Sequence, residues 1–268
     1  MTQLLPDDFA EAVSARPELC GCRFEYEPVV SSTNDLAVVL AGTNVETGTV
    51  VLADRQTVGR GRRGHDWYSP AGVGIYMSVI FRHVSSPMVT LLAGVSVVES
   101  IHALTGVEAE LKWPNDVIVR GKSKQSDRVR VRKVAGVLVE ALPAESGTGV
   151  VVGIGVNVHS SVRPAELEEM AASLEELSDT KIERGPLCAD IRVRLDEWLG
   201  RLQLLGSSSV TERWRELSPS SHGVPVSWEE VGIRKSGITN GIDETGALLV
   251  LSEEGVQRVV GGELSWEL

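Results

Sequence analysis

The chain has 268 residues, of which 42% are hydrophobic and 24% are charged, as in ordinary folded proteins and unlike disordered ones. Its formal net charge of -11 repels phosphates and weighs against DNA or RNA as the main partner. We expect no apolar run of the roughly 18 to 20 residues that spans a bilayer, and positions 1–8 carry no Lys or Arg, so neither secretion nor membrane anchoring is expected.

The cysteines indicate a reducing compartment. Cys20, Cys22 and Cys188 are an odd number in a long chain, which does not suit a disulfide framework, and we therefore expect a cytoplasmic protein. Cys20-Gly21-Cys22 could be half of a metal site, but no second Cys/His cluster with ligand spacing follows it in the sequence, which disfavours that interpretation.

Up to residue 154 the pattern alternates between strands and helices. It predicts helices at 4–15, 32–40 and 89–105, and strands at 24–30, 49–53, 74–82, 108–111, 117–120, 134–140 and 149–154. At the start of the second helix, Ser32 and Asp35 fit a capping box. Residues 54–74 are rich in Gly and Arg and predict a long loop, which in a compact domain is usually functional or mobile.

The second half of the chain changes character. Helical patterns fill 164–177 and 186–204, and short strands separated by Gly, Asn or Asp turns follow at 224–227, 236–242, 247–251, 256–260 and 263–266. Five short strands suffice for a small barrel but not for a sandwich. We therefore predict a larger domain at 1–217 and a smaller one at 218–268.

One basic segment departs from its surroundings. Residues 121–132 contain Lys122, Lys124, Arg128, Arg130 and Arg132 against one acid, Asp127. A charged, apolar-poor insertion is by default a solvated, mobile loop, and a binding device is the alternative.

The loop from Gly59 to Gly64 places three arginines among three glycines. Its backbone can fold tightly around an anion while the guanidinium groups supply charge-assisted donors, so a phosphate or a carboxylate is the natural ligand. It is no Walker loop, because no Gly-Lys-Ser/Thr ending follows. By composition alone, an RNA-binding patch or a flexible surface loop is equally compatible.

Three further segments contain polar residues among strand-like ones. They are Lys112-Trp113-Pro114-Asn115-Asp116, then Lys133 to Glu140, and Gly153-Ile154-Gly155-Val156-Asn157-Val158. Each alone has a structural explanation, such as a core Trp, a strand-breaking Pro, a bulge Gly or a turn Asn. Their joint occurrence in this order is more informative.

In combination these segments resemble the biotin protein ligase family. The resemblance also includes Ser32-Thr33-Asn34, Gln56 and Trp67 before them and Gly261 to Ser265 near the end of the chain. It implies an α+β fold, in which a mixed sheet flanked by helices forms a class II synthetase-like catalytic domain and an SH3-like β-barrel follows from about residue 218.

The resemblance also implies a reaction. Biotin and MgATP would form biotinyl-5'-AMP, and a lysine of a biotin carboxyl carrier protein, from a biotin-dependent carboxylase, would then displace AMP. The cofactors are ATP and Mg, with the Mg carried by ATP and no protein metal site assigned.

The family's functional residues map onto matching positions. Biotin-binding residues would be Ser32, Thr33, Asn34, Gln56, Arg60, Gly61, Arg62, Lys133 and Gly136. Nucleotide-binding residues would be Arg60, Arg62, Trp67, Lys133 and Asn157. Catalytic residues would be Lys133, Arg62, Asp116 and Lys112. Asp116 would help to hold Mg, accept a proton from the incoming amine, or only brace its loop.

The chain departs from the family pattern in several places. His65 and Glu267 replace residues that are commonly basic, and the stretch between Val119 and Lys133 is longer than usual. Only about 30 residues precede Ser32, too few for the helix-turn-helix domain of bifunctional members, so we expect a ligase that is not a repressor.

Two alternatives stay open on the sequence. A lipoate ligase would share the fold but does not usually have the arginine-glycine loop. A nucleic-acid-binding protein would account for the two basic segments, but the acidic net charge and the lack of interleaved aromatic residues oppose it.

Overall fold

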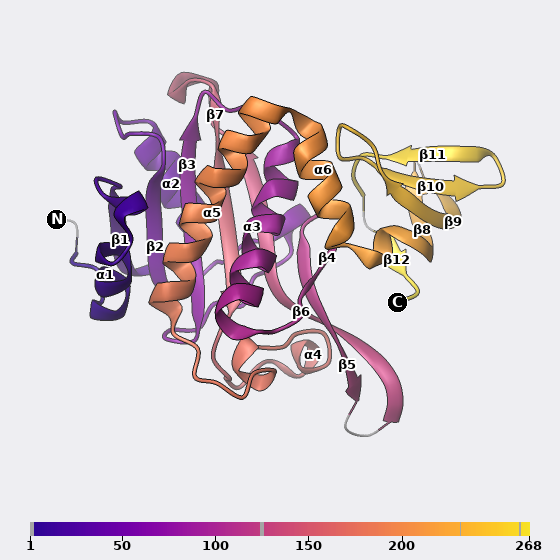
Figure 1. Ribbon diagram of the computed structural model, residues 1–268, viewed down its shortest axis with the longest axis horizontal. Helices are drawn as coiled ribbons and strands as arrows, with labels where there is room; N and C mark the ends of the chain where they lie inside the picture. The colour runs from indigo at the N-terminus through magenta and orange to yellow at the C-terminus, as the bar shows by residue number, and fades with distance from the viewer. Residues whose placement is uncertain (1–2, 124–125, 231, 263) are drawn as a thin grey trace.

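The computed structural model describes residues 3–123, 126–230, 232–262 and 264–268, with only the backbone described where strands run through 122–129. Within these residues a seven-stranded sheet forms the larger part of the molecule (Figure 1). Its strands are β1 (Phe24–Val30), β2 (Thr49–Gln56), β3 (Gly74–Arg82), β4 (Glu110–Lys112), β5 (Asp116–Ser123), β6 (Ser126–Ala141) and β7 (Gly149–Asn157). They lie in the order β1-β2-β3-β7-β6-β5-β4, with β1 and β2 parallel and the other pairs antiparallel, so the sheet is mixed as expected.

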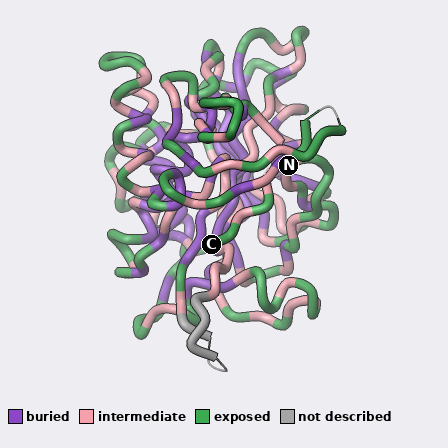
Figure 2. The backbone as a smooth tube through the Cα atoms, turned by 90° about the vertical axis from the view of Figure 1, so that its right-hand side faces the viewer, coloured by how far each residue is buried: buried purple, intermediate pink, exposed green. Residues whose placement is uncertain are grey.

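Helices cover both faces of this sheet. One face carries α1 (Asp7–Ser14), α3 (Met88–Thr105), α5 (Arg184–Leu205) and α6 (Ser207–Glu216), and the other carries α2 (Thr33–Ala41) (Figure 1). Alternation along β2 explains the two layers, because Val50 and Leu52 join the core under α3 and α5 while Val51 packs with Ala37 of α2. The buried residues accordingly lie in the middle of the molecule (Figure 2).

Helix α3 corrects one expectation. Its 18 residues are long and apolar enough to cross a membrane by length and composition, although no such stretch was expected. Of its residues 67% are buried, and the helix packs on the sheet beside α5 (Figure 1). A core helix passes the same test of length and composition.

The C-terminal strands form a second sheet. They are β8 (His222–Glu230), β9 (Ile233–Ile242), β10 (Leu248–Ser252), β11 (Gly255–Val259) and β12 (Leu264–Trp266), in the antiparallel order β11-β10-β9-β8-β12. This SH3-like unit contacts the larger sheet where Trp113 Nε1 donates to Gly246 O at 2.9 Å. The division of the chain at residue 217 stays a prediction.

The helix predicted at 164–177 is wrong for most of its length. Helix α4 covers only Ala165–Glu168, and a short 3-10 turn covers Leu174–Glu176. Between them Ala171 forms a parallel bridge to Lys133 of β6. Backbone pairing with β6 therefore overrides the helical spacing of the apolar residues. Helix α6 was not predicted, because its Ser-rich start lacks an apolar period.

The basic insertion is also structured differently from the expected mobile loop. β5 and β6 continue into it as a paired ribbon, with Arg120 opposite Val131 and Gly121 opposite Arg130, and this ribbon extends beyond the body of the sheet (Figure 1). Lys124 and the side chains of Lys122, Asp127 and Arg128 lie outside the described part of the chain.

Candidate active site

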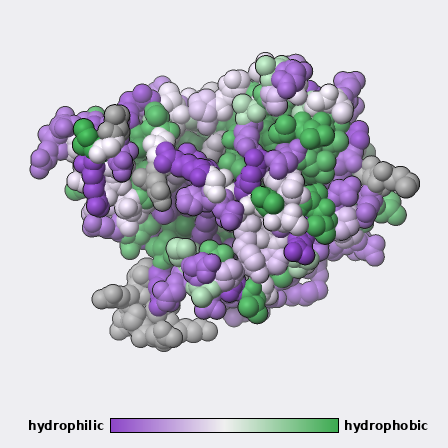
Figure 3. Space-filling view, turned by 180° about the vertical axis from the view of Figure 1, so that it is seen from behind, coloured by the Kyte–Doolittle hydropathy of each residue, from purple (hydrophilic) through white to green (hydrophobic). Residues whose placement is uncertain are grey.

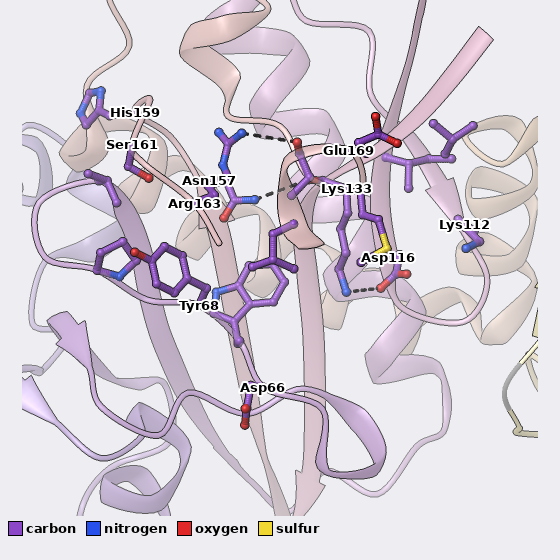
Figure 4. Close-up of a pocket in the computed structure, with 18 of the residues that line it drawn as sticks. Asp66, Tyr68, Lys112, Asp116, Lys133, Asn157, His159, Ser161, Arg163 and Glu169 are labelled. Carbon is purple, nitrogen blue, oxygen red and sulfur yellow. Dashed lines mark hydrogen bonds and ion pairs between the residues drawn. The ribbon is translucent and has the colours of Figure 1, made fainter. Parts of the chain in front are cut away.

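Two cavities adjoin on the face of the sheet that carries α2. Figure 3 shows the molecule from behind, where hydrophilic and hydrophobic side chains are mixed. The larger cavity measures about 540 Å³, and its lining includes Trp67, Lys112, Asp116, Lys133 and Asn157 (Figure 4). The smaller measures about 40 Å³, and its lining includes Ser32, Thr33, Asn34, Gln56, Arg60, Gly61, Trp67, Lys133 and Gly136. Because Trp67 and Lys133 line both, the cavities meet at these two side chains.

The indole of Trp67 lies directly on two glycines of the sheet. Gly136 of β6 and Gly155 of β7 are paired in register, and a β-carbon added at these positions would lie 3.1 Å and 2.4 Å from the Trp67 ring. Only residues without a side chain allow this approach. Trp67 Nε1 is buried against Gly155 and has no hydrogen-bond partner among the described residues.

Three charged groups of the larger cavity influence one another, and one of them, Lys133, lies near this ring. Lys133 Nζ lies 2.5 Å from Asp116 Oδ1 and 5.1 Å from the centre of the Trp67 ring (Figure 4). Burial lowers the pKa of Lys112, Asp116 opposes this shift, and the positive charge of Lys133 adds to it. One carboxylate thus lies beside two ammonium groups, so this cluster carries one net positive charge, while Asp66, Glu169 and Arg163 also line the cavity.

The Ser-Thr-Asn segment and Gln56 form one hydrogen-bond network. Gln56 Oε1 accepts from the backbone N of Thr33 at 2.8 Å, and Ser78 Oγ donates to Asn34 Oδ1 at 2.6 Å and lies 2.8 Å from Thr33 Oγ1. Ser32 is buried at the N-cap position of α2 but makes no side-chain cap bond, so the predicted capping box is wrong. Ser78 was missed in the sequence because it is a lone hydroxyl in an apolar strand.

Arg60 fastens the arginine-glycine loop to the sheet and to α2. Its Nη2 lies 2.7 Å from Asp35 Oδ1 and 3.0 Å from Glu140 Oε2, and Glu140 also accepts from Asn34 Nδ2 at 2.6 Å. Asp35 therefore pairs with the loop instead of capping its helix. Arg60 lines the smaller cavity but not the larger one.

Arg62 lies apart from both cavities. It lines a third space of about 380 Å³ between the two sheets, together with Trp113, Gly246 and Val260. Burial and the neighbouring Arg63 lower the pKa of Arg62, while Asp116 raises it. The side chain is thus half-buried at the contact between the loop and the C-terminal sheet rather than beside Lys133.

Asn157 lies in the larger cavity, where its amide binds the protein itself. Asn157 Nδ2 donates to the carbonyl oxygens of Ala172 at 3.2 Å and Lys133 at 3.4 Å. It therefore fastens the segment after α4 to β6.

The C-terminal sheet contributes Trp266 to the larger cavity. The sequence predicted a strand at this residue but no role in a site. Trp266 lines the larger cavity, and Lys112 Nζ lies 5.8 Å from the centre of its ring. Its position near the chain end gave no signal of this contact. His65 and Glu267 line neither cavity.

No group of three or more His, Cys, Asp or Glu residues could hold a metal ion in the part of the chain that the structure describes.

The fold and these motifs match known proteins. A sequence model of the biotin/lipoate A/B protein ligase family matches residues 26–157. The bifunctional ligase/repressor BirA of Bacillus spizizenii is 33% identical, over 93% of this chain and 75% of its own length. This chain belongs to the biotin protein ligase family. Another relative, the biotin–[acetyl-CoA-carboxylase] ligase of Paracoccus denitrificans, is 27% identical over 87% of this chain and 96% of its own.

The biotin protein ligase from Aquifex aeolicus, solved in complex with biotin and ATP, superposes with a TM-score of 0.77 at 30% identity. It covers 91% of this chain and 98% of its own, so the similarity includes the SH3-like sheet that the family model does not reach. Family membership and the expected α+β architecture are thereby confirmed.

Proposed function

We propose that this biotin protein ligase joins biotin to ATP to form biotinyl-5'-AMP and then transfers biotin to a lysine of a biotin carboxyl carrier protein. The observation that carries this function is the pair of cavities that meet at Lys133 and Trp67. The relatives support it, since the Aquifex enzyme holds biotin and ATP and the Paracoccus enzyme is a biotin–[acetyl-CoA-carboxylase] ligase.

The smaller cavity has the polar and apolar groups that biotin would need, and at about 40 Å³ it would have to widen to admit the ligand. Its polar groups belong to Ser32, Thr33, Asn34 and Gln56, which lie at one end, while Val137 and Ile154 supply apolar surface. A few fixed polar groups in an otherwise apolar space orient a small bicyclic ligand.

The larger cavity suits the nucleotide. Trp67 and Trp266 offer aromatic surface for the adenine, and Lys112 and Lys133 offer positive charge for the phosphates. The amide oxygen of Asn157 would accept a hydrogen bond from the nucleotide, because the amide nitrogen already donates to the protein backbone.

Lys133 would perform the central task of the first step. The biotin carboxylate must attack the α-phosphate of ATP and expel pyrophosphate, so two anions must approach each other. An ammonium group at the junction of the two cavities offsets this repulsion and stabilises the charge that develops on the phosphate oxygens. Asp116 keeps the Lys133 side chain aimed at the junction.

In the second step a neutral acceptor amine would attack the carbonyl carbon of the mixed anhydride, and AMP would leave. Asp116 is the carboxylate closest to Lys133 and is placed to take the proton that the amine loses. Arg62, at the contact between the loop and the C-terminal sheet, would keep the loop closed until that lysine arrives.

Mg²⁺ would enter with ATP. Asp116 is the carboxylate closest to Lys133 and already forms an ion pair with it. Among the described residues the cavity would therefore offer Mg²⁺ one carboxylate and not a full set of protein ligands. Mg²⁺ bound mainly by substrate phosphates and water suits such a site. When bound, the ion would neutralise the departing pyrophosphate.

Biotin-stimulated exchange of pyrophosphate into ATP tests this function. We expect exchange with biotin but not with lipoate, and subsequent labelling of a purified carrier domain. Exchange with lipoate alone would favour the alternative ligase, and micromolar, salt-sensitive DNA binding would favour a nucleic-acid role. The cytoplasmic location and the lack of repressor function stay predictions.

A further inference from the structure

The segment 163–176 forms one wall of the larger cavity. Arg163, Leu167, Met170 and Ala171 line it from this side (Figure 4). The inner edge of the segment is fixed to β6 by two backbone hydrogen bonds, from Lys133 N to Met170 O at 2.8 Å and from Ala172 N to Lys133 O at 3.0 Å. The same residue that faces the two cavities therefore also anchors this wall.

The outer edge of the wall is held by arginines of the basic insertion. Arg130 Nη2 lies 3.4 Å from Glu169 Oε1, and Arg132 Nη1 lies 3.5 Å from Glu176 Oε2. Glu176 also pairs with Arg163, whose Nη1 donates to Ala171 O at 3.4 Å. In Figure 1 the α4 segment lies beside the ribbon of β5 and β6, where these contacts occur.

The end of the wall is fixed, because Ala172, Ser173 and Leu174 are buried, but the part at 164–170 has few other contacts among the described residues. The wall's regular structure is a four-residue helix and a short 3-10 turn, and Met170 is 59% exposed although it contributes to the cavity. Segments with few buried contacts open at low free-energy cost, so modest interactions decide whether they are ordered. The ion pairs at Glu169 and Glu176 are interactions of that size.

We propose that the basic insertion is a brace for the nucleotide cavity, through Arg130 and Arg132 of β6. These two arginines are positioning residues: they contact the 163–176 segment, which lines the cavity, and do not contact ATP themselves. The inference rests on the proposed function of the larger cavity. It predicts that the brace favours ATP binding and leaves biotin binding, on the far side of Trp67, unaffected.

The first test is Arg132→Gln, measured by biotin-dependent exchange of pyrophosphate into ATP. Loss of a partly exposed ion pair typically changes a binding equilibrium by up to about fivefold. Because Glu176 pairs with both Arg132 and Arg163, the loss of Arg132 also affects the second pair, and we expect the KM for ATP to rise by roughly three- to tenfold. The KM for biotin and kcat should stay within about twofold, because the smaller cavity does not contact the wall. The matched control is Arg120→Gln, since Arg120 lies on the same ribbon but pairs with Glu110 of β4 at 2.8 Å.

The second test exchanges the charges of one pair. Arg130→Glu alone should raise the KM for ATP, and adding Glu169→Arg should restore it to within about twofold of wild type. Because Glu169 lines the larger cavity, Glu169→Arg alone is the control, and it should raise the KM for ATP rather than lower it. The brace is refuted if the KM for ATP is unchanged in Arg132→Gln, if the KM for biotin rises equally, or if Arg120→Gln has the same effect. Failure of the proposed function is distinct, because the wild-type chain itself would then show no biotin-dependent exchange.

Discussion

Gly155 and Trp67 are so close that a β-carbon at residue 155 would lie 2.4 Å from the indole nitrogen. Gly155→Ala must therefore displace the ring that separates the two cavities. A misplacement of about 1 Å near reacting groups can cost roughly 100-fold in rate, and we expect a loss of that order in biotin-dependent exchange. The melting temperature should change little, because the strand itself accepts alanine.

Gly200→Ala is the matched control for this variant. Gly200 lies in α5, and a β-carbon there would meet nothing within 4 Å. Alanine in a helix is more favourable than glycine by up to about 1 kcal/mol, so this variant should keep full activity and be slightly more stable. Exchange activity of Gly155→Ala equal to that of this control would contradict the role of the Trp67 platform.

Lys133→Ala should abolish most adenylate formation. Removing a preorganised positive group from a site of developing charge costs about 100- to 1,000-fold. Its ion pair with Asp116 is partly exposed, so stability should fall by at most about 1 kcal/mol, or roughly 2–4 °C in melting temperature. Lys181→Ala, at a surface ion pair, serves as the control for loss of a lysine. Exchange activity within a few fold of wild type would remove Lys133 from the mechanism.

Arg62→Gly should release the activated intermediate. Arg62 lines the space between the loop and the C-terminal sheet, so its loss should loosen the loop, and this would appear as faster dissociation of the bound intermediate. Freed biotinyl-5'-AMP acylates exposed amines without selection. The measurement is biotin incorporation into a non-substrate protein, with ATP present. If adenylate still forms but bystander labelling does not increase, Arg62 does not contain the intermediate.

Acid should loosen the C-terminal sheet through Asp243. Burial raises the pKa of Asp243, but hydrogen bonds from Thr245 and Arg258 outweigh it and lower that pKa to about 2, below the ordinary value of an aspartate. A carboxyl whose pKa is lower in the folded state stabilises the fold above its unfolded pKa, and this stability is lost as the pH falls from about 4 toward 2. Melting temperatures of wild type and Asp243→Asn across this range should converge at the acid end. A constant difference between them would refute the linkage.

The strands and the motif residues could be predicted from the sequence because both follow local patterns. Phe24–Val30 and Gly74–Arg82 have the predicted bounds, since β-branched residues and turn signals mark their ends. The motif residues assigned to biotin line the smaller cavity, with the exception of Arg62.

What could not be predicted depends on contacts between distant segments. The chain around Ala171 is extended because it pairs with Lys133, and Asp35 leaves its helix cap because Arg60 lies beside it. Trp266 reaches the larger cavity only because the second sheet packs against the first. Spacing along one segment contains no information on any of these pairings.

The contribution of Trp266 to the larger cavity has a consequence for fragments of this chain. Residues from both sheets must be present for ATP to meet its complete set of contacts, since Lys112 and Trp266 lie on opposite sides of the interface. Two separately expressed pieces, 1–217 and 218–268, would therefore associate more tightly when the nucleotide is present, because a ligand that contacts both pieces favours their association by mass action. ATP would thus raise the affinity of the two pieces for each other.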